Sequence, residues 1–194
     1  MPSAHASASR PLLLRPFRST DVQGVREAID ESLAEVQRWL PWGSEEPSSL
    51  EQLAGRIDRY ATECDAGTAW RLALVDQTNG RFLGSGALLP YPGPGALEVG
   101  YWVRNSEAGR GLATRAAAAL IRYGFRQKGI ERMELWTKPG NEPSAAVARR
   151  LGFVFREQRE TSRAGAAPQL YDIFDLSSLS DLRAAEDPYV RVAL

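Results

Sequence analysis

The sequence contains very few of the residues that form covalent cross-links or metal centres. Its one cysteine, Cys64, excludes an internal disulfide, and its one histidine, His5, argues against a histidine-ligated metal site. No apolar run approaches the length that spans a membrane, and the leader MPSAHASASR lacks the apolar core of a signal peptide. We therefore expect no metal, no membrane partner and a cytoplasmic location.

The sequence also lacks an excess of positive or of negative charge. Acidic and basic residues balance at 24 each, so the sequence gives no electrostatic reason to expect a nucleic-acid partner. The basic residues are nearly all arginine, with Lys128 and Lys138 as the two lysines. This composition excludes little else, although arginine suits the recognition of phosphates.

What remains is an ordinary globular composition. The 194 residues are 43% hydrophobic and 25% charged, which is enough for one soluble domain with a sizeable core. We expect a disordered tail over 1–10, one domain over 11–177, and an extension over 178–194 whose pattern has no clear period.

Hydrophobic periodicity and turn residues predict the secondary structure. A strand over 11–17 precedes a helix from Asp21 to about Arg38, and Pro and Gly in WLPWGSEEPSS end that helix. The remaining predictions are a helix over 49–64, three strands in AWRLALVD, RFLGSGALLP and LEVGYWV, a helix over 112–127, a strand in RMELWTK, a helix in NEPSAAVARRLGF, and strands in FVFREQ and QLYDIFDLSS. Hairpins followed by interleaved helices predict a mixed α/β (α+β) domain with one sheet covered on both faces.

A glycine loop joins the strand EVGYWV to the helix that follows it. In AGRGLAT, Gly109 and Gly111 permit positive φ or a close backbone approach, while Ala113 and Thr114 keep the first helical turn slim. Amides that open a helix have no partner within it and carry partial positive charge, so an anion can bind directly to them. The loop therefore predicts a phosphate site.

Two other interpretations of the loop stay open. One is a glycine turn that binds no ligand. The other is a nucleotide site for NAD or ATP, although the dinucleotide fingerprint expects a small third residue where this chain has Thr114.

A second element of interest is NEPSAAVARRLGF. It places Asn141 and Ser144 at the start of a short helix that ends at Leu151-Gly152-Phe153. Asn141 is a natural N-cap and Pro143 suits the first turn, so capping alone would also explain the pattern.

Together the two elements identify a resemblance. The pattern GYWVRNSEAGRGLAT…NEPSAAVARRLGF resembles the GCN5-related N-acetyltransferase (GNAT) superfamily, and within it the ribosomal-protein N-terminal acetyltransferases of the RimJ/RimL type. The resemblance extends over about residues 11–177 and includes LLLRPF, WLPW and YDIFDLSSL. One departure is Ala108, which stands where the superfamily loop usually has Gln or Arg.

The resemblance implies a fold and a cofactor site. The implied sheet is mostly antiparallel and seven-stranded, is splayed between strands 4 and 5, and has helices on both faces. Acetyl-CoA, as co-substrate, would extend its pantetheine arm along the main chain of the fourth strand and place its pyrophosphate on the glycine loop. The implied cofactor-binding residues are Tyr101, Trp102, Val103, Gly109, Arg110, Gly111, Leu112, Ala113, Thr114 and Asn141. Arg104, Arg110 and Arg149 are further candidates for the nucleotide phosphates.

The resemblance also implies the chemistry, which is attack of a neutral amine on a thioester in a ternary complex. Such attack needs removal of a proton from the amine, stabilisation of an oxyanion, and a proton for the thiolate. We assign Glu98 as the base or the anchor of a water that serves as base, and Ser144 as the acid. The structural alternatives are a strand residue facing solvent for Glu98 and a cap for Ser144.

Amine chemistry ranks the acceptors. An α-amine with a pKa of about 8 is roughly one-tenth neutral at pH 7, whereas a lysine amine near 10.4 costs about 3 kcal/mol more to deprotonate. We therefore expect an acetyl-CoA-dependent N-acetyltransferase that acts on the α-amine of a protein N-terminus or a small molecule. The alternative is an acyl-CoA-binding sensor of the same fold that does not turn over. A homodimer is suggested by the family alone. Trp39, Trp42 and Trp70 are interpreted as packing residues more readily than as an aromatic cage.

Overall fold

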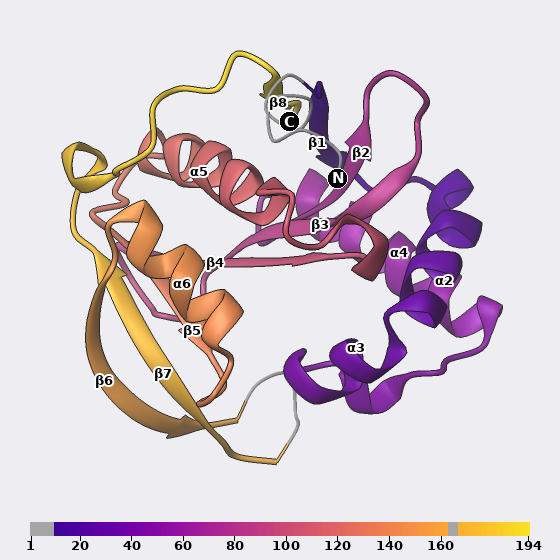
Figure 1. Ribbon diagram of the computed structural model, residues 1–194, viewed down its shortest axis with the longest axis horizontal. Coiled ribbons are helices and arrows are strands. Elements are labelled where there is room, and N and C mark those ends of the chain that lie inside the picture. Colours follow the sequence, from indigo (N-terminus) through magenta and orange to yellow (C-terminus); the bar gives the residue numbers. More distant parts are fainter. Residues whose placement is uncertain (1–9, 163–166) are drawn as a thin grey trace.

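The computed structural model describes residues 10–162 and 167–194. Residues 1–9 of the expected tail lie outside this description, whereas Arg10, its last residue, makes ion pairs with Asp76 and Glu107. The described chain folds into one eight-stranded sheet with helices on both faces (Figure 1).

The strands are β1 (Leu12–Pro16), β2 (Trp70–Asp76), β3 (Phe82–Leu89), β4 (Ala96–Val103), β5 (Arg132–Thr137), β6 (Val154–Thr161), β7 (Gln169–Leu176) and β8 (Val190–Val192). The helices are α2 (Val22–Glu31), α3 (Leu33–Trp39), α4 (Leu50–Asp65), α5 (Leu112–Phe125) and α6 (Glu142–Leu151). Short 3-10 turns are η1 (Ser19–Asp21), η2 (Gly43–Glu45), η3 (Asn105–Glu107) and η4 (Leu179–Asp181).

The sheet order is β6-β7-β5-β4-β3-β2-β1-β8, and five of its seven strand pairs are antiparallel. The predicted mixed, mostly antiparallel sheet is therefore confirmed, with eight strands in place of seven. The additional strand, β8, pairs in parallel with β1 and comes from the C-terminal segment, for which the sequence pattern had no clear period.

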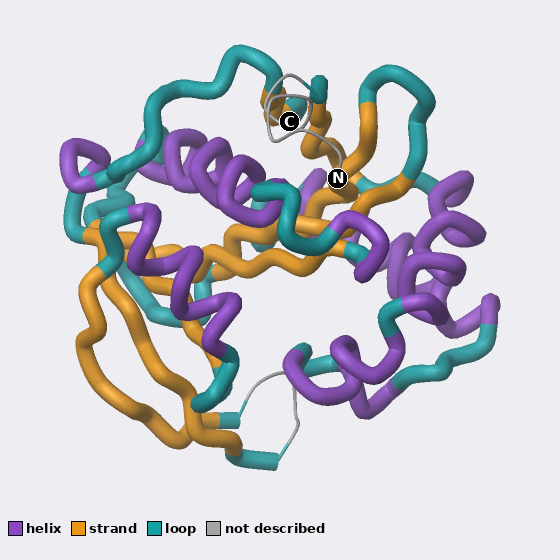
Figure 2. The backbone as a smooth tube through the Cα atoms, viewed as in Figure 1, coloured by secondary structure: helices purple, strands orange, loops and turns teal. Residues whose placement is uncertain are grey.

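Two hydrophobic cores lie on opposite faces of the sheet. One packs α5 and α6 on the sheet, and the other packs α2, α3 and α4 on it. The tube view shows the same division, with α2–α4 gathered at the right and α5 and α6 at the left (Figure 2). The sheet is thus covered on both faces, as predicted.

The single helix predicted from Asp21 to about Arg38 is wrong in one respect, because it is interrupted at Ser32 between α2 and α3. Ser32 is buried, and its hydroxyl oxygen accepts a hydrogen bond from the amide of Asn105 at 2.9 Å. The break therefore reflects a contact with a residue 73 positions away, which helical periodicity does not report.

Strand β4 is paired along its length on one side and only at its beginning on the other. It pairs with β3 from Gly84↔Val103 to Leu89↔Glu98, whereas its parallel ladder with β5 runs from Ala96↔Arg132 to Glu98↔Glu134. After Glu98 the two strands separate. The predicted splay between strands 4 and 5 is therefore confirmed.

Candidate active site

The glycine loop lies where β4 is connected to α5. Gly109 and Gly111 have φ values of 73° and 75°, in the left-handed region that favours glycine, and Gly111 is the N-cap of α5. Among the described residues, apart from the adjoining chain, no heavy atom lies within 4 Å of a Cβ built at either glycine. Backbone conformation, and not crowding by the protein, thus requires these glycines, and the space beside the opening turn of α5 is open.

The first turn of α5 offers main chain to a ligand. Gly111 has no side chain to cap the helix, and the side chain of Leu112 is buried in the core, so Leu112 can contribute only its main chain. The amides of a first helical turn have no partner within the helix. The main-chain amides that open α5 therefore face space that is accessible to a ligand. The presence of Ala108, where the superfamily loop usually has Gln or Arg, does not alter these amides.

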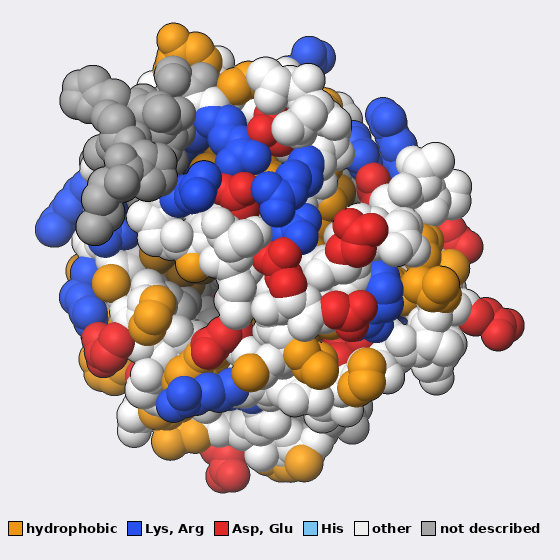
Figure 3. Space-filling view, turned by 45° about the vertical axis from the view of Figure 1, so that its right-hand side comes forward, with side chains coloured by type: hydrophobic (Ala, Val, Ile, Leu, Met, Phe, Trp, Pro, Cys, Tyr) orange, Lys and Arg blue, Asp and Glu red, His pale blue; other side chains and the backbone are white. Residues whose placement is uncertain are grey.

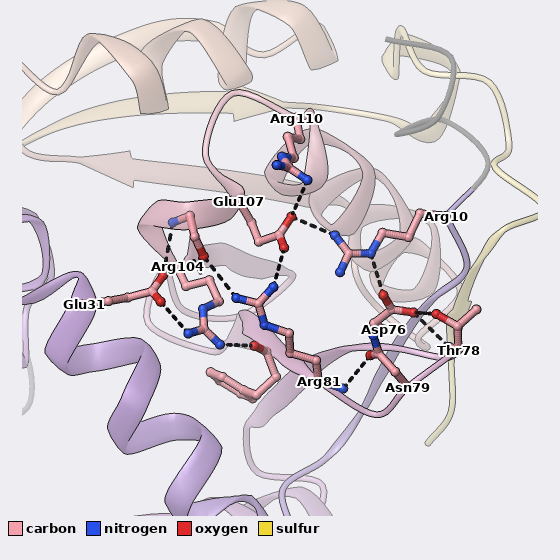
Figure 4. Close-up of polar contacts among 11 residues, drawn as sticks. Arg10, Glu31, Asp76, Thr78, Asn79, Arg81, Arg104, Glu107 and Arg110 are labelled. Carbon is pink, nitrogen blue, oxygen red and sulfur yellow. Dashed lines mark hydrogen bonds and ion pairs between the residues drawn. The ribbon is translucent and has the colours of Figure 1, made fainter. Parts of the chain in front are cut away.

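A network of ion pairs anchors the segment that leads into this loop (Figure 4). The buried carboxylate of Glu107 contacts Arg10 at 2.7 Å, Arg81 at 3.0 Å and Arg110 at 3.4 Å. Arg10 also contacts Asp76 at 2.7 Å, which joins the end of β2 to the network. Residues in or next to β1, β2 and β3 thereby fix the position of the segment that precedes the glycine loop.

Arg104 belongs to the same anchoring region. It is buried, donates a hydrogen bond to the carbonyl of Phe82 at 3.1 Å, and forms an ion pair with Glu31. The hydrogen bond from Arg104 is the main cause that lowers the pKa of the Glu31 carboxyl to about 2. Arg104, a sequence candidate for the nucleotide phosphates, is thus engaged within the fold and ties α2 to the end of β4.

A cavity of about 630 Å³ lies at the splay, where residues of both β4 and β5 line it. It is lined from α3, α4 and their connection on one side and by residues of β4, β5 and α6 on the other, including Glu98, Tyr101, Trp102, Asn141 and Ser144. The structure therefore brings both predicted catalytic residues to one cavity, together with three of the predicted cofactor residues, Tyr101, Trp102 and Asn141. Among the described lining residues, Val103 and the glycine loop 109–114 do not appear.

Alternation along β4 sends its side chains to the two faces of the sheet. Trp102 packs on the core of α2–α4, whereas Tyr101 and Val103 pack on the core of α5 and α6. Glu98 is four residues before Trp102 and shares its face, where it is only 3% exposed. Glu98 is therefore not a solvent-facing strand residue, and it approaches the cavity from the α2–α4 side.

Asn141 and Ser144 approach the cavity from the opposite face. The side chain of Asn141 caps α6 by accepting from the amide of Ser144 at 3.3 Å, so its capping role is confirmed. The side chain of Ser144 does not complete that cap. Its Oγ lies 3.1 Å from the hydroxyl oxygen of Tyr101, on the α5–α6 side of β4.

Sequence reasoning missed one arginine that contacts the glycine loop. Arg150 of α6 donates a hydrogen bond from Nη1 to the hydroxyl of Thr114 in the first turn of α5, at 3.1 Å. The neighbouring candidate Arg149 instead pairs with Glu142 on the surface at 3.0 Å. Because the two arginines are adjacent on one helix, the sequence offered no signal to separate them.

Of the three tryptophans considered for an aromatic cage, Trp39 and Trp42 line the cavity, and Trp42 and Trp70 also pack against a core. The Trp42 ring lies 5.9 Å from the Trp102 ring, and the guanidinium of Arg56 lies 5.1 Å from the Trp42 centroid. Trp70 packs on Tyr123 in the other core. A cage for a cationic ligand at Trp42 would therefore have to displace a cation of the protein itself.

Basic and acidic side chains are interleaved over the face shown in Figure 3. Within the described residues, no group of three or more His, Cys, Asp or Glu side chains is arranged to hold a metal ion. No helix in the described part of the chain is long and apolar enough to cross a membrane.

Comparison with known proteins decides the family. The family model described as the acetyltransferase (GNAT) domain matches residues 11–154. The chain belongs to the GNAT acetyltransferase family. A GNAT relative from Bacillus subtilis, the "Putative ribosomal N-acetyltransferase YdaF", is 39% identical over 158 residues, which cover 74% of this chain and 78% of the relative.

Two further similarities extend this assignment. The spermidine N(1)-acetyltransferase of Escherichia coli K12 is 26% identical over 79% of this chain and 75% of its own length. The structure of RimL, described as a ribosomal L7/L12 alpha-N-protein acetyltransferase in complex with coenzyme A, superposes with a TM-score of 0.75 at 20% identity, over 89% of this chain and 97% of that one. The predicted GNAT fold and the resemblance to the RimJ/RimL branch are thus confirmed, and this GNAT protein is an N-acetyltransferase.

Proposed function

We propose that this protein transfers an acetyl group from acetyl-CoA to an α-amine, most readily that of a protein N-terminus, by direct attack in a ternary complex. The observation that supports this most strongly is the cavity at the splay, which is lined by Glu98 from one face of the sheet and by Ser144 from the other. An acceptor and a donor that entered from opposite faces would meet between these two side chains.

The chain's own groups match the requirements of the donor. The six residues 109–114 would hold its diphosphate through main-chain amides, and Arg110 would add charge beside them. The main chain of Tyr101 to Val103, beyond the end of the β4–β5 ladder, would pair with the pantetheine arm. Asn141 lines the same cavity and would contact the arm from the start of α6.

Each chemical need has a candidate group. Glu98, or a water that it holds, would accept the proton of the amine on the α2–α4 side. A main-chain amide of β4 would stabilise the oxyanion, and Ser144 would supply a proton to the departing thiolate on the α5–α6 side.

Charge in the cavity favours an α-amine over a polyamine. The described lining contains four basic side chains, Arg56, Arg59, Arg71 and Lys138, and three acidic ones, Glu45, Glu63 and Glu98. A polyamine carries several positive charges, so a lining without an acidic excess would repel its remote amines. A peptide N-terminus presents one amine, which Glu98 can receive, so it needs no excess of acidic side chains in the lining.

An acceptor screen followed by mass spectrometry tests this proposal. The panel would contain peptides with a free N-terminus, the same peptides with a blocked N-terminus and an internal lysine, and spermidine. We expect acetylation of the free α-amines, at a rate well above that of the lysine peptides. Transfer to spermidine alone would refute the substrate class, and binding of acetyl-CoA with no release of thiol for any acceptor would refute the activity. The homodimer, which the resemblance implies, and the cytoplasmic location, which the composition of the sequence favours, stay predictions.

A further inference from the structure

The side chain of Tyr101 has no role in the chemistry described so far, since only its main chain is proposed to contact the donor. Yet its hydroxyl oxygen lies 3.1 Å from Oγ of Ser144 and 3.4 Å from the Ser144 carbonyl oxygen. The contact joins residues 43 positions apart and bridges β4 to the first turn of α6, both of which line the cavity.

We propose that Tyr101 is a positioning residue for Ser144: its hydroxyl donates a hydrogen bond to Oγ of Ser144, which leaves the hydrogen of Ser144 to point into the cavity. This inference rests on the proposed function, because it deepens the role given to Ser144.

The direction of this hydrogen bond follows from what each group can do. Burial raises the pKa of the Tyr101 hydroxyl to about 12, so this hydroxyl keeps its proton throughout the neutral range. A serine hydroxyl has one hydrogen and two lone pairs, so it can accept from Tyr101 and still donate elsewhere. The alternative acceptor for Tyr101, the Ser144 carbonyl, lies 0.3 Å farther away (3.4 against 3.1 Å).

The same hydrogen bond would stabilise the negative charge that develops on Oγ of Ser144 during the reaction. As the C–S bond breaks, its electron pair stays on sulfur, and the proton of Ser144 Oγ moves to that sulfur. Negative charge then develops on Oγ, where a donor from Tyr101 and the amino end of α6 both oppose it. The serine oxygen recovers a proton from a water in the cavity, and the amine loses its surplus proton to solvent on the Glu98 side, so protons balance over one turnover.

The test compares four variants with the wild type: Tyr101→Phe, Ser144→Ala, the double variant, and Tyr123→Phe. Tyr123 packs in the same core against the Trp70 ring, so it controls for the loss of a tyrosine hydroxyl there. We expect Tyr101→Phe to lower kcat by about tenfold or more, the usual weight of a hydrogen bond to a charged group, with KM for acetyl-CoA changed by less than about twofold. In the Ser144→Ala background the same change should have little effect.

A second readout does not depend on turnover. The thiol of bound CoA can be titrated through the ultraviolet absorbance of its thiolate. A donor at Ser144 would lower the thiol pKa in the wild type, and Ser144→Ala and Tyr101→Phe should each raise it by about one unit, again without additivity in the double variant.

These results distinguish a failure of the role proposed for Tyr101 from a failure of the proposed function. An active wild type in which Tyr101→Phe keeps the wild-type kcat and thiol pKa would overturn the inference while leaving the proposed function in place. An equal loss of kcat in both backgrounds would also overturn it, because the loss would then be structural. A wild type that transfers to no acceptor would refute the proposed function, and the thiol titration would still decide whether Tyr101 acts on Ser144.

Discussion

The proposal that the glycine loop binds the diphosphate of CoA can be tested by substitution of Gly111, with a second glycine as a matched control. Replacing Gly111 by Trp would place a large side chain over the opening turn of α5, where the described structure, apart from the adjoining chain, has no heavy atom within 4 Å of the added Cβ. The cost to folding comes from φ, which is +75° there, and amounts to roughly 1–2 kcal/mol for a residue other than glycine. Gly67 is the matched control, because its φ is +65° and its Cβ position is equally open, at the end of α4.

The expected effect on binding is much larger than the effect on folding. Loss of at least two charge-assisted hydrogen bonds from amides to the diphosphate, at about 1.5–3 kcal/mol each, removes about 3 kcal/mol or more. Since about 1.4 kcal/mol corresponds to a tenfold change, Gly111→Trp should weaken CoA binding by more than about 100-fold. Gly67→Trp should lose a similar amount of stability and retain wild-type affinity.

Titration calorimetry with CoA measures the affinity, and a thermal melt of each variant without ligand measures the stability. A Gly111→Trp protein that binds CoA within a few-fold of wild type would refute this proposal. An equal loss of affinity in Gly67→Trp would show that the assay reports backbone strain and not occupation of the site.

Three further predictions address the base Glu98, the ion pair between Arg104 and Glu31, and the packing of β3 against β4. Glu98→Gln should lower kcat by about 100-fold at unchanged CoA affinity, and a wild-type rate would leave Glu98 structural. The hydrogen bond from Arg104 lowers the pKa of the Glu31 carboxyl from 4.5 to about 2, so the contribution of Glu31 to the free energy of unfolding is present above pH 4.5 and lost as the pH falls towards 2. Urea titrations should therefore show a free energy of unfolding that depends less steeply on pH in that window for Glu31→Gln. An unchanged slope would contradict this. Gly84→Ala should destabilise by about 2–3 kcal/mol because its Cβ would lie 2.1 Å from the carbonyl oxygen of Trp102 at a φ of +152°, whereas Gly100→Ala, with 3.7 Å to its nearest neighbour, should melt near the wild type.

Much of the fold could be predicted because local rules dominate it. The strands and helices follow hydrophobic periodicity, and both glycines of the loop adopt the positive φ that their position suggested. The two departures are the break at Ser32 and the strand β8. Each depends on a partner that is distant in the chain, Asn105 in one case and β1 in the other, so neither leaves a local periodic signal.

The candidate site also contains features that the sequence predicted and contacts that it could not predict. Glu98, Asn141 and Ser144 could be named through the resemblance to the GNAT superfamily, and the structure places all three on one cavity. The contact of Tyr101 with Ser144 and that of Arg150 with Thr114 could not, because each joins two elements whose relative position depends on how α6 packs over the sheet.

The sequence by itself determined which segments become strands and helices, where the glycine loop stands, and which family the chain resembles, since these follow from short-range backbone preferences and residue order. Only the tertiary structure decided which face of β4 each side chain serves, that Glu98 is buried, and that Arg104 is engaged in an ion pair with Glu31. These features arise from packing between elements far apart in the chain, and packing is a property of the whole fold.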